Sequence, residues 1–452
     1  MAANVKRPRS NRSYLERKLY AVLQYNYIIF PFTHLLTFYL IHQLAYVTGY
    51  TVISDDNWNW TTTIHFLLNI CFLIGQLPPY ASLWGMCLPM QPYENQQAPK
   101  SRAFKLLRIC LVTKATNFQT VINSTSHWNK LQHPNLRFHV VVDGGSEHVF
   151  DKSLPSYVHL DYVPVSFKPQ RAMYKARALE FFRRKHKLTP LDWVLHLDEE
   201  SEINQEVITA CLDFIERGDA DIGMGTILYN AANHWKNSFL STAEVIRIAD
   251  DYGRFQLPVR LFRRPILGWM HGSWILINGA VENKVTWDTA CIAEDFWFAY
   301  QAASLGCKFG WLHAIVREQP PCTLGDFLKQ RRRWYTGIFS IGGITVRASL
   351  VASVMGVACF FLTPFFRVFG QNVAFPPWYS YWTLFNQTTE IHALLVASVI
   401  QDMTMPDISW VAVVLHALEV ILLAPFVHLM QAAAMVSCLF APSRGFNVVK
   451  KI

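Results

Sequence analysis

The segment "DWVLHLDEE" (residues 192–200) decides the fold. Its first part is a short, nearly continuous apolar run, and three carboxylates follow at once: Asp198, Glu199 and Glu200. A short apolar run of this kind predicts a strand buried on both faces, as in a parallel sheet. Because side chains alternate along a strand, Asp198 and Glu200 are expected on the same side. Two carboxylates about 4 Å apart repel by about 4 kcal/mol at an effective dielectric constant of about 20, so water or a cation has to solvate this group.

Two other segments resemble this one in pattern. "LLRICLVTKAT" (residues 106–116) and "LRFHVVVDGGSE" (residues 136–147) are apolar strands that end in polar residues, and residues 171–187 are helical in composition. Alternating strands and helices predict an α/β domain with a mainly parallel sheet covered on both faces. Ligands of such sheets bind beyond the carboxyl ends of the strands, so we expect the three strand ends to form one site.

Long uncharged stretches flank this domain. The chain is 52% hydrophobic and 16% charged, and residues 19–54 and 57–93 contain no Asp, Glu, Lys or Arg. Each is long enough to contain a membrane-spanning helix of about 20 residues. Basic residues precede the first stretch and follow the second, so the positive-inside rule places the N-terminus and the α/β domain in the cytosol.

The C-terminal region is apolar again. Residues 348–366 and 420–443 are charge-free and long enough to span a bilayer, whereas residues 368–408 are ambiguous. We favour four spans in total, with residues 368–408 lumenal or interfacial; five or six spans remain open. The predicted organisation is a basic cytosolic N-terminus (1–18), two transmembrane helices with a short lumenal loop (19–93), a cytosolic catalytic domain (94–336), a membrane region of about two spans plus interfacial segments (337–443) and a basic tail (444–452).

The net charge and the cysteines exclude other classes. The formal charge is +9, but the basic residues lie beside apolar stretches, which indicates membrane topology and contact with anionic lipid or phosphate, and not nucleic acid. The nine cysteines form no Cys-x-x-Cys pair, which disfavours zinc and redox motifs and fits a reduced cytosolic domain.

Two further motifs carry charged groups. Glu294 and Asp295 begin an apolar helical run, where the helix dipole favours acids; alternatively, one of them is a general base. The segment "FLKQRRRW" (residues 327–334) places three arginines before Trp334. These arginines either mark the cytosolic border of the next span or bind a diphosphate, to which guanidinium donors are suited.

Taken in order, the motifs resemble those of the family 2 inverting glycosyltransferases, which have a GT-A-like α/β fold. The order is Asp143 at a strand end, Asp-x-Glu at 198–200, Glu-Asp at 294–295 and Gln-x-x-Arg-Trp at 330–334. The resemblance implies Asp295 as the catalytic base with Glu294 beside it, and Trp334 together with Asp295 in the acceptor site. It implies Asp198 and Glu200 as ligands of a divalent cation, Mn²⁺ or Mg²⁺. The nucleotide-sugar-binding residues that it implies are Thr113, Lys114, Asp143, Lys175, Asp198, Gln330 and Arg333.

Within that family the chain resembles the egghead-type β-1,4-mannosyltransferases of invertebrates. This resemblance implies GDP-mannose as donor, glucosylceramide as membrane-lipid acceptor, and a location in the endoplasmic reticulum or Golgi with the catalytic domain facing the cytosol. Two positions depart from the family pattern: Glu200 stands where Asp is usual, and Arg177 where Gly is frequent. The alternatives are a ceramide glucosyltransferase that uses UDP-glucose, a processive polysaccharide synthase and a non-catalytic membrane protein.

Overall fold

The structure is a computed structural model. It describes residues 14–47, 77–88, 103–145, 148–231, 237–368, 377–405 and 408–443, and the single positions 60, 63, 67, 235, 445, 449 and 451. The basic N-terminal residues before 14, the predicted lumenal loop, most of the second apolar stretch and the polar linker around residues 91–100 lie outside this part of the chain.

A seven-stranded sheet forms the centre of the α/β domain. Its order is β3-β2-β1-β4-β6-β5-β7, and every strand except β6 runs in the same direction. The mainly parallel sheet predicted from the sequence is therefore confirmed. The strands are β1 (Leu106–Thr113), β2 (Leu136–Val142), β3 (Val158–Tyr162), β4 (Asp192–Leu197), β5 (Ile222–Leu228), β6 (Ile275–Asn278) and β7 (Phe309–Arg317).

The central strand β4 is buried along its whole length, as its apolar run predicted. It lies between β1, parallel to it, and β6, antiparallel to it. The carboxyl ends of β1 and β4 consequently lie side by side, which brings Thr113 and the acidic residues after Leu197 to the same edge of the sheet.

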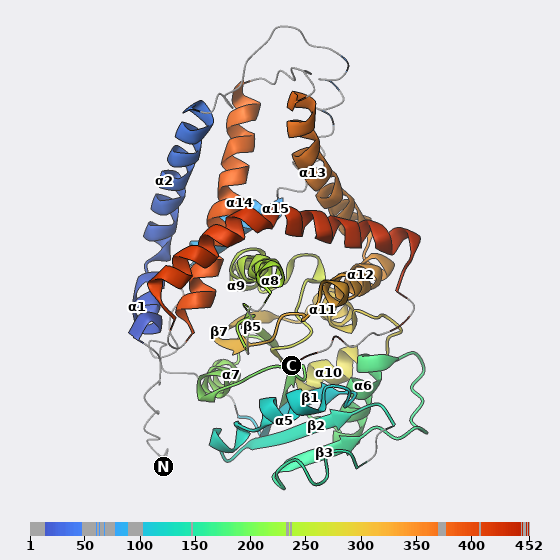
Figure 1. Cartoon of the computed structure of the whole chain (residues 1–452). Coiled ribbons are helices and arrows are strands. Elements are labelled where there is room, and N and C mark those ends of the chain that lie inside the picture. The colour runs from blue at the N-terminus through green and yellow to red at the C-terminus, as the bar shows by residue number, and fades with distance from the viewer. Residues whose placement is uncertain are drawn as a thin grey trace.

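Helices cover both faces of this sheet (Figure 1). Both ends of α7 carry typical capping residues. The Asn204 side chain accepts a hydrogen bond from the Val207 amide at the start of the helix, and Gly218 ends the helix in the left-handed conformation. The helices of the domain are α5 (Phe118–Thr125), α6 (Tyr174–His186), α7 (Gln205–Arg217), α8 (Ser238–Asp250), α9 (Gln256–Phe262), α10 (Gly279–Val285), α11 (Glu294–Ser304) and α12 (Leu324–Ile341), with a π-helical turn η4 (Asp251–Phe255) after α8.

The remaining helices form a group that we call the helical stem. It consists of α2 (Asn26–Val47), α13 (Ile344–Val368), α14 (Pro377–Met403) and α15 (Trp410–Phe440). Figure 1 shows α2, α13 and α14 standing upright, with α15 crossing them beside the α/β domain. The first charge-free stretch is divided, because α1 (Tyr14–Leu23) ends before α2 begins. α4 (Leu77–Met86) packs against η4 and α14.

The helices of the stem run in different directions (Figure 1). Residues 377–403 form an upright helix, whereas the strongly apolar residues 420–443 belong mostly to the crossing helix α15 (Figure 1). The reason is packing: α15 contacts α8 and α12 of the α/β domain, and its residues Val413, Val420 and Val427 are buried. Among the described helices, α2 and α15 are long and apolar enough to cross a membrane, and the number of spans stays a prediction.

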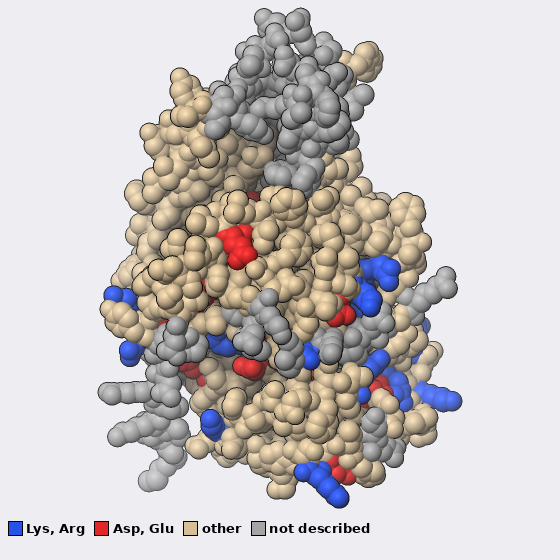
Figure 2. Space-filling view, in the orientation of Figure 1, with Lys and Arg blue, Asp and Glu red and all other residues tan. Residues whose placement is uncertain are grey.

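Charged residues are distributed as a membrane protein requires. On the face shown in Figure 2, none of the residues coloured as Lys or Arg lies over the upright parts of α2, α13 and α14, and they gather on the α/β domain below. α2 contains no charged residue at all. This distribution is compatible with membrane anchoring through the stem.

Candidate active site

A cavity of about 140 Å³, here called the polar cavity, lies at the carboxyl edge of the sheet. The structure brings every site residue predicted from the sequence into its lining, although these residues come from six separate segments of the chain. These residues are Thr113, Lys114, Asp143, Lys175, Asp198, Glu200, Glu294, Asp295, Gln330, Arg333 and Trp334.

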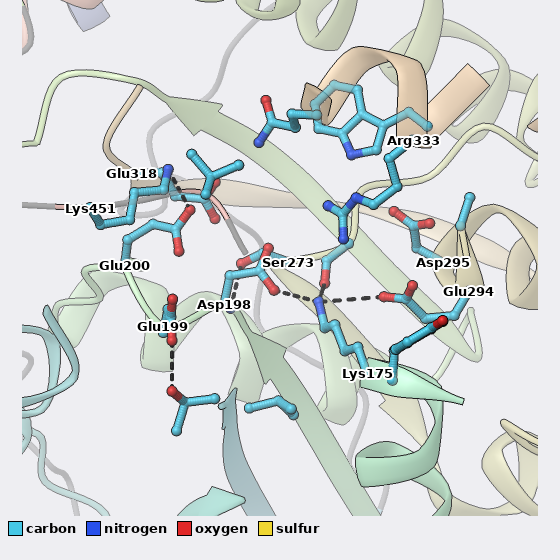
Figure 3. Close-up of a pocket in the computed structure, with 18 of the residues that line it drawn as sticks. Lys175, Asp198, Glu199, Glu200, Ser273, Glu294, Asp295, Glu318, Arg333 and Lys451 are labelled. Carbon is cyan, nitrogen blue, oxygen red and sulfur yellow. Dashed lines mark hydrogen bonds and ion pairs between the residues drawn. The ribbon is translucent and has the colours of Figure 1, made fainter. Parts of the chain in front are cut away.

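The three carboxylates after β4 point in different directions (Figure 3). Glu199 accepts hydrogen bonds from Thr113 Oγ1 at 2.6 Å and from Asn117 Nδ2 at 2.5 Å. Burial, together with the neighbouring carboxylate of Glu200, raises the pKa of Glu199 to about 7. Asp198 and Glu200 are engaged instead by two lysine ammonium groups, which separates their function from that of Glu199.

Lys175 forms the centre of the first cluster. This residue lies in the first turn of α6. Its Nζ donates to the Asp198 carboxylate and to the Gly272 carbonyl, and lies 3.7 Å from Glu294 Oε1 (Figure 3). Burial opposes the charged form of Lys175, but Asp198 and Glu294 outweigh it and raise the pKa above its ordinary value. A protonated Lys175 therefore joins the Asp-x-Glu motif to the Glu-Asp motif.

The Glu-Asp pair lies at the N-terminus of α11. Asp295 accepts a hydrogen bond from the Phe296 amide at 2.8 Å. Burial raises the pKa of both carboxyls, that of Glu294 to about 7, although Lys175 and Arg333 oppose the effect. A carboxylate with a raised pKa is a better proton acceptor than an ordinary one, as a general base requires.

Gly272 packs directly on this pair. A Cβ atom at this position would lie 3.0 Å from Asp295 Oδ2 and 3.6 Å from Lys175 Nζ. The absence of a side chain thus lets the loop before β6 approach both charged groups.

The arginines of α12 divide between two tasks. Arg331 is 2% exposed and forms an ion pair of 2.7 Å with the buried Glu244, which also binds Arg247 at 2.8 Å. Arg333 instead lines the polar cavity, where burial lowers its pKa and the acidic residues of the cavity oppose that shift. Of the three arginines predicted together, Arg331 is therefore a structural residue and Arg333 faces the site.

Trp334 lies beside this network. The Arg331 and Arg247 guanidinium carbons are 4.2 Å and 4.8 Å from the centre of its ring. Cation–π contacts of this kind hold the indole in place. Part of the flat surface expected to face a sugar is thus used by arginine.

Asp143 is also paired. Its carboxylate accepts from Arg177, which further donates to the Pro164 and Phe167 carbonyls. Burial raises the pKa of Asp143, while Arg177 and Lys114 oppose the shift. Arg177 stands where Gly is frequent in the family. It supplies the positive charge that pairs with Asp143, the residue predicted to bind the nucleoside.

Several residues of the cavity were missed by the sequence analysis. Arg247 comes from α8, and Gly272 and Ser273 from the loop before β6, none of which carries a motif. Val449 and Lys451 come from the tail, far from every other site residue in sequence. No spacing or composition signal links the tail to the sheet, so these two positions could be found only from the structure.

The carboxylates fit a divalent cation. Asp198 and Glu200 are oxygen donors that line the same cavity, and the Asp198 side chain is 34% exposed, so a cation and its waters can reach it. Hard cations such as Mg²⁺ and Mn²⁺ take such ligands. The two residues do not share one face of a strand as expected, because β4 ends at Leu197 and a turn follows. His139, Asp161 and His186 form another group of potential ligands among the described residues, but none of them lines the polar cavity.

A second cavity, of about 310 Å³, lies between the α/β domain and the stem. We call it the stem cavity. Apolar residues of α13, α14 and α15, such as Val357, Leu394 and Ala432, form one part of its wall. Most of the remaining wall belongs to the α/β domain and includes charged residues such as Asp250 and Arg254. Both cavities are lined by Arg247, Gly272, Ala293, Asp295 and Trp334.

Comparisons with known proteins identify the family of this chain. Residues 193–438, more than half of the chain, match the model of "Glycosyl transferase family group 2". The chain belongs to this family. The match includes the Asp-x-Glu, Glu-Asp and Gln-x-x-Arg-Trp motifs, so the resemblance seen in the sequence is confirmed at the level of the family.

Relatives within the family are mannosyltransferases by name. The chain is 35% identical over 198 residues to beta-1,4-mannosyltransferase bre-3 of Caenorhabditis elegans, covering 42% of each chain. It is 30% identical over 249 residues to beta-1,4-mannosyltransferase egh of Drosophila melanogaster, covering 54% of this chain and 49% of that one. The aligned parts thus span about half the length of these curated relatives, or less. Among solved structures, mannosyltransferase PcManGT from Pyrobaculum calidifontis, in complex with GDP-Man and Mn²⁺, is similar with 12% identity and a TM-score of 0.45 over 84% of this chain and 99% of that chain.

Proposed function

We propose that this protein is an inverting β-1,4-mannosyltransferase that transfers mannose from GDP-mannose to glucosylceramide. The names of the two relatives support the sugar and the linkage. The polar cavity supports a nucleotide sugar, because it combines cationic groups for a diphosphate with carboxylates for a cation. The apolar wall of the stem cavity supports an acceptor that carries a lipid.

One observation carries the proposal: Asp295 lines both cavities. A base in this position can face the anomeric carbon of a donor on one side and the hydroxyl of an acceptor on the other. Glu294 lines the polar cavity, and the stem cavity does not include it. This difference favours Asp295 over Glu294 as the group that takes the proton.

The reaction is a single displacement. Asp295 accepts the proton of the acceptor hydroxyl while that oxygen attacks the anomeric carbon, and the nucleoside diphosphate leaves from the opposite face. One displacement inverts an α-linked donor to a β-linked product, so a second carboxylate acting as nucleophile is not needed. Arg333 and the protonated Lys175 place positive charge where the leaving group gains negative charge.

A divalent cation fits beside these groups. Asp198 and Glu200 would hold it, and it would neutralise charge on the leaving diphosphate. Lys175, which already contacts Asp198, keeps that carboxylate oriented toward the cavity. Asp143 and Lys114 lie at the strand ends of β2 and β1, where the nucleoside is expected.

The proposed location is the membrane of the endoplasmic reticulum or Golgi, with the α/β domain in the cytosol. The sequence offers a test, because Asn59 and Asn123 each begin an Asn-x-Thr sequence, which is an acceptor for N-glycosylation. Asn59 is expected to be lumenal and to carry glycan. Asn123, which is exposed on α5, is expected to carry none, and glycan on Asn123 would reverse the orientation.

A donor screen tests the reaction. The full chain in microsomes is given glucosylceramide with GDP-mannose or UDP-glucose, with Mn²⁺ or with a chelator, and the glycolipid products are identified by mass. The expected product is glucosylceramide extended by one hexose from GDP-mannose only, and the chelator should abolish its formation.

Two other outcomes would replace the proposal. Transfer of glucose from UDP-glucose to ceramide would make the protein a ceramide glucosyltransferase. Repeated addition of sugar to one acceptor would make it a processive synthase.

A further inference from the structure

Lys451, a residue of the tail, lines the polar cavity. Lys451 has a side chain only 4% exposed, and its ammonium group lies 2.8 Å from Glu200 Oε1 and donates to the Gln319 carbonyl at 2.6 Å (Figure 3). Val449, two positions earlier, lines the same cavity. A buried ammonium group is costly unless it is paired and hydrogen-bonded, and both conditions are met here.

The backbone of the tail is fixed as well. Asn117 Nδ2 donates to the Val449 carbonyl at 2.9 Å, and the Lys451 amide donates to Asn117 Oδ1 at 3.3 Å. The same Asn117 amide group donates to Glu199. One asparagine after β1 therefore holds both the tail and the carboxylate that precedes Glu200, so the position of Lys451 is tied to that of the Asp-x-Glu motif.

The charges around Lys451 show what its ammonium group can do. Glu200 and Glu318 lie on its side of the cavity, and Lys175 and Arg333 lie on the other side, near Asp198 and Glu294 (Figure 3). An anion placed between these groups would be approached by cations from both sides. A diphosphate is the part of a nucleotide sugar that benefits from such an arrangement.

We propose that Lys451 is a donor-site residue, which positions Glu200 and contacts the diphosphate of the donor and of the leaving nucleoside diphosphate. This inference rests on the proposed function, because it assumes a nucleotide-sugar donor in the polar cavity. It adds to the predicted donor site a cationic group from outside every family motif.

Nucleotide binding by the purified full-length protein in detergent tests the inference without requiring turnover. GDP and guanosine are titrated with Mn²⁺ present, and binding is followed by calorimetry. The Lys451→Met protein loses one charge-assisted contact, so it should bind GDP about tenfold more weakly than the unsubstituted protein. Guanosine lacks the diphosphate, and both proteins should bind it with the same affinity. Lys451→Arg keeps the charge and should retain most of the GDP affinity. Lys152→Met, at an exposed position, is the matched control and should change neither ligand.

The other outcomes contradict the inference. Unchanged GDP binding by Lys451→Met would mean that the ammonium group does not reach the diphosphate. Tighter binding would mean that the tail competes with the donor, and an equal loss for GDP and guanosine would mean that the substitution acts through folding. A parallel titration with UDP separates this inference from the proposed function: if the unchanged protein binds UDP and not GDP, the proposed donor is wrong, and the same variants are compared with UDP.

Discussion

The polar cavity and the stem cavity share a wall but differ in chemistry. The first is lined by the charged ends of parallel strands and by α12, whereas the second combines charged residues of the α/β domain with apolar residues of three stem helices. Under the proposed function, this difference would separate the binding of a charged, water-soluble donor from that of a lipid-linked acceptor. Only the shared wall, with Asp295 and Gly272, has to serve both. Changes in that wall are expected to affect chemistry, and changes elsewhere to affect one substrate at a time.

The largest effect is expected at the shared wall itself. Asp295→Asn removes the proton acceptor and should lower kcat by about 10²- to 10⁴-fold, the usual contribution of a general base. Donor binding should remain, because Asn keeps the size of Asp. Steady-state kinetics with a parallel GDP titration measure both quantities. Full activity in this variant would show that Asp295 is not the base, and Glu294→Gln is the comparison that would then identify its neighbour.

The pH dependence provides a second test of the same residue. Burial raises the pKa of Asp295, so the folded protein protonates this carboxyl at a higher pH than an ordinary aspartate. The base works only when it is deprotonated. We therefore expect kcat to fall as the pH decreases through this raised pKa, about tenfold per pH unit well below it. A profile that stays flat down to the ordinary pKa of aspartate, about 3.9, would contradict the assignment.

The next effect concerns the polar cavity alone. Glu200→Gln removes a proposed cation ligand and should weaken Mn²⁺ binding by at least about tenfold, since even an outer partner of a metal ligand contributes that much. Glu199→Gln is the matched control: Thr113 and Asn117 bind the Glu199 carboxylate, and its pKa near 7 means that a neutral group is already tolerated there. Measurement of free Mn²⁺ by electron paramagnetic resonance compares the two. A larger loss in Glu199→Gln would reverse the roles of the two glutamates.

A smaller effect on kcat is expected when a methyl group is added to the shared wall at Gly272. Gly272→Ala places a Cβ atom 3.0 Å from Asp295 Oδ2, so the carboxylate has to shift by a few tenths of an ångström. A displacement of this size should reduce kcat by about tenfold, given that 1 Å can cost about 100-fold. Gly343→Ala is the control, because a Cβ atom there meets nothing within 4 Å. Equal rates in both variants would show that the close approach of Gly272 does not matter for the chemistry.

The polar cavity also shows how far the sequence predicts this site. Each strand end was predicted from an apolar run followed by polar residues, and the sheet then brings Thr113, Asp143 and Asp198 together, because parallel strands end at one edge. Lys451 could not be predicted, because its contact with Glu200 joins positions 251 residues apart and no motif links them. The pairing of Arg331 with Glu244 was hidden for a related reason: three consecutive arginines look alike until the rotation of the helix is known.

The arrangement of the stem helices is harder to predict from the sequence than the sheet is. Apolar composition marks both α2 and α15, yet α2 stands upright and α15 crosses the stem beside the α/β domain (Figure 1). Burial in a protein and burial in lipid require the same apolar residues, so composition does not distinguish them. The contacts of α15 with α8 and α12, which are distant in sequence, decide its direction.

The smallest effect is expected in the stem cavity, and it tests whether the acceptor uses it. Val357→Phe narrows the cavity from α13 and should raise the KM for glucosylceramide a few-fold, of the order of one misplaced apolar contact, while the KM for GDP-mannose stays constant. Val351→Phe lies on the same helix at a position 46% exposed and outside the cavity lining, so it should change neither constant. A rise in both constants would indicate that α13 acts on the whole site through its packing. A rise in the KM for the acceptor alone would mean that the lipid reaches Asp295 along the stem helices. The apolar residues of these helices would then bind the acceptor, a function that the motifs of the α/β domain do not reveal.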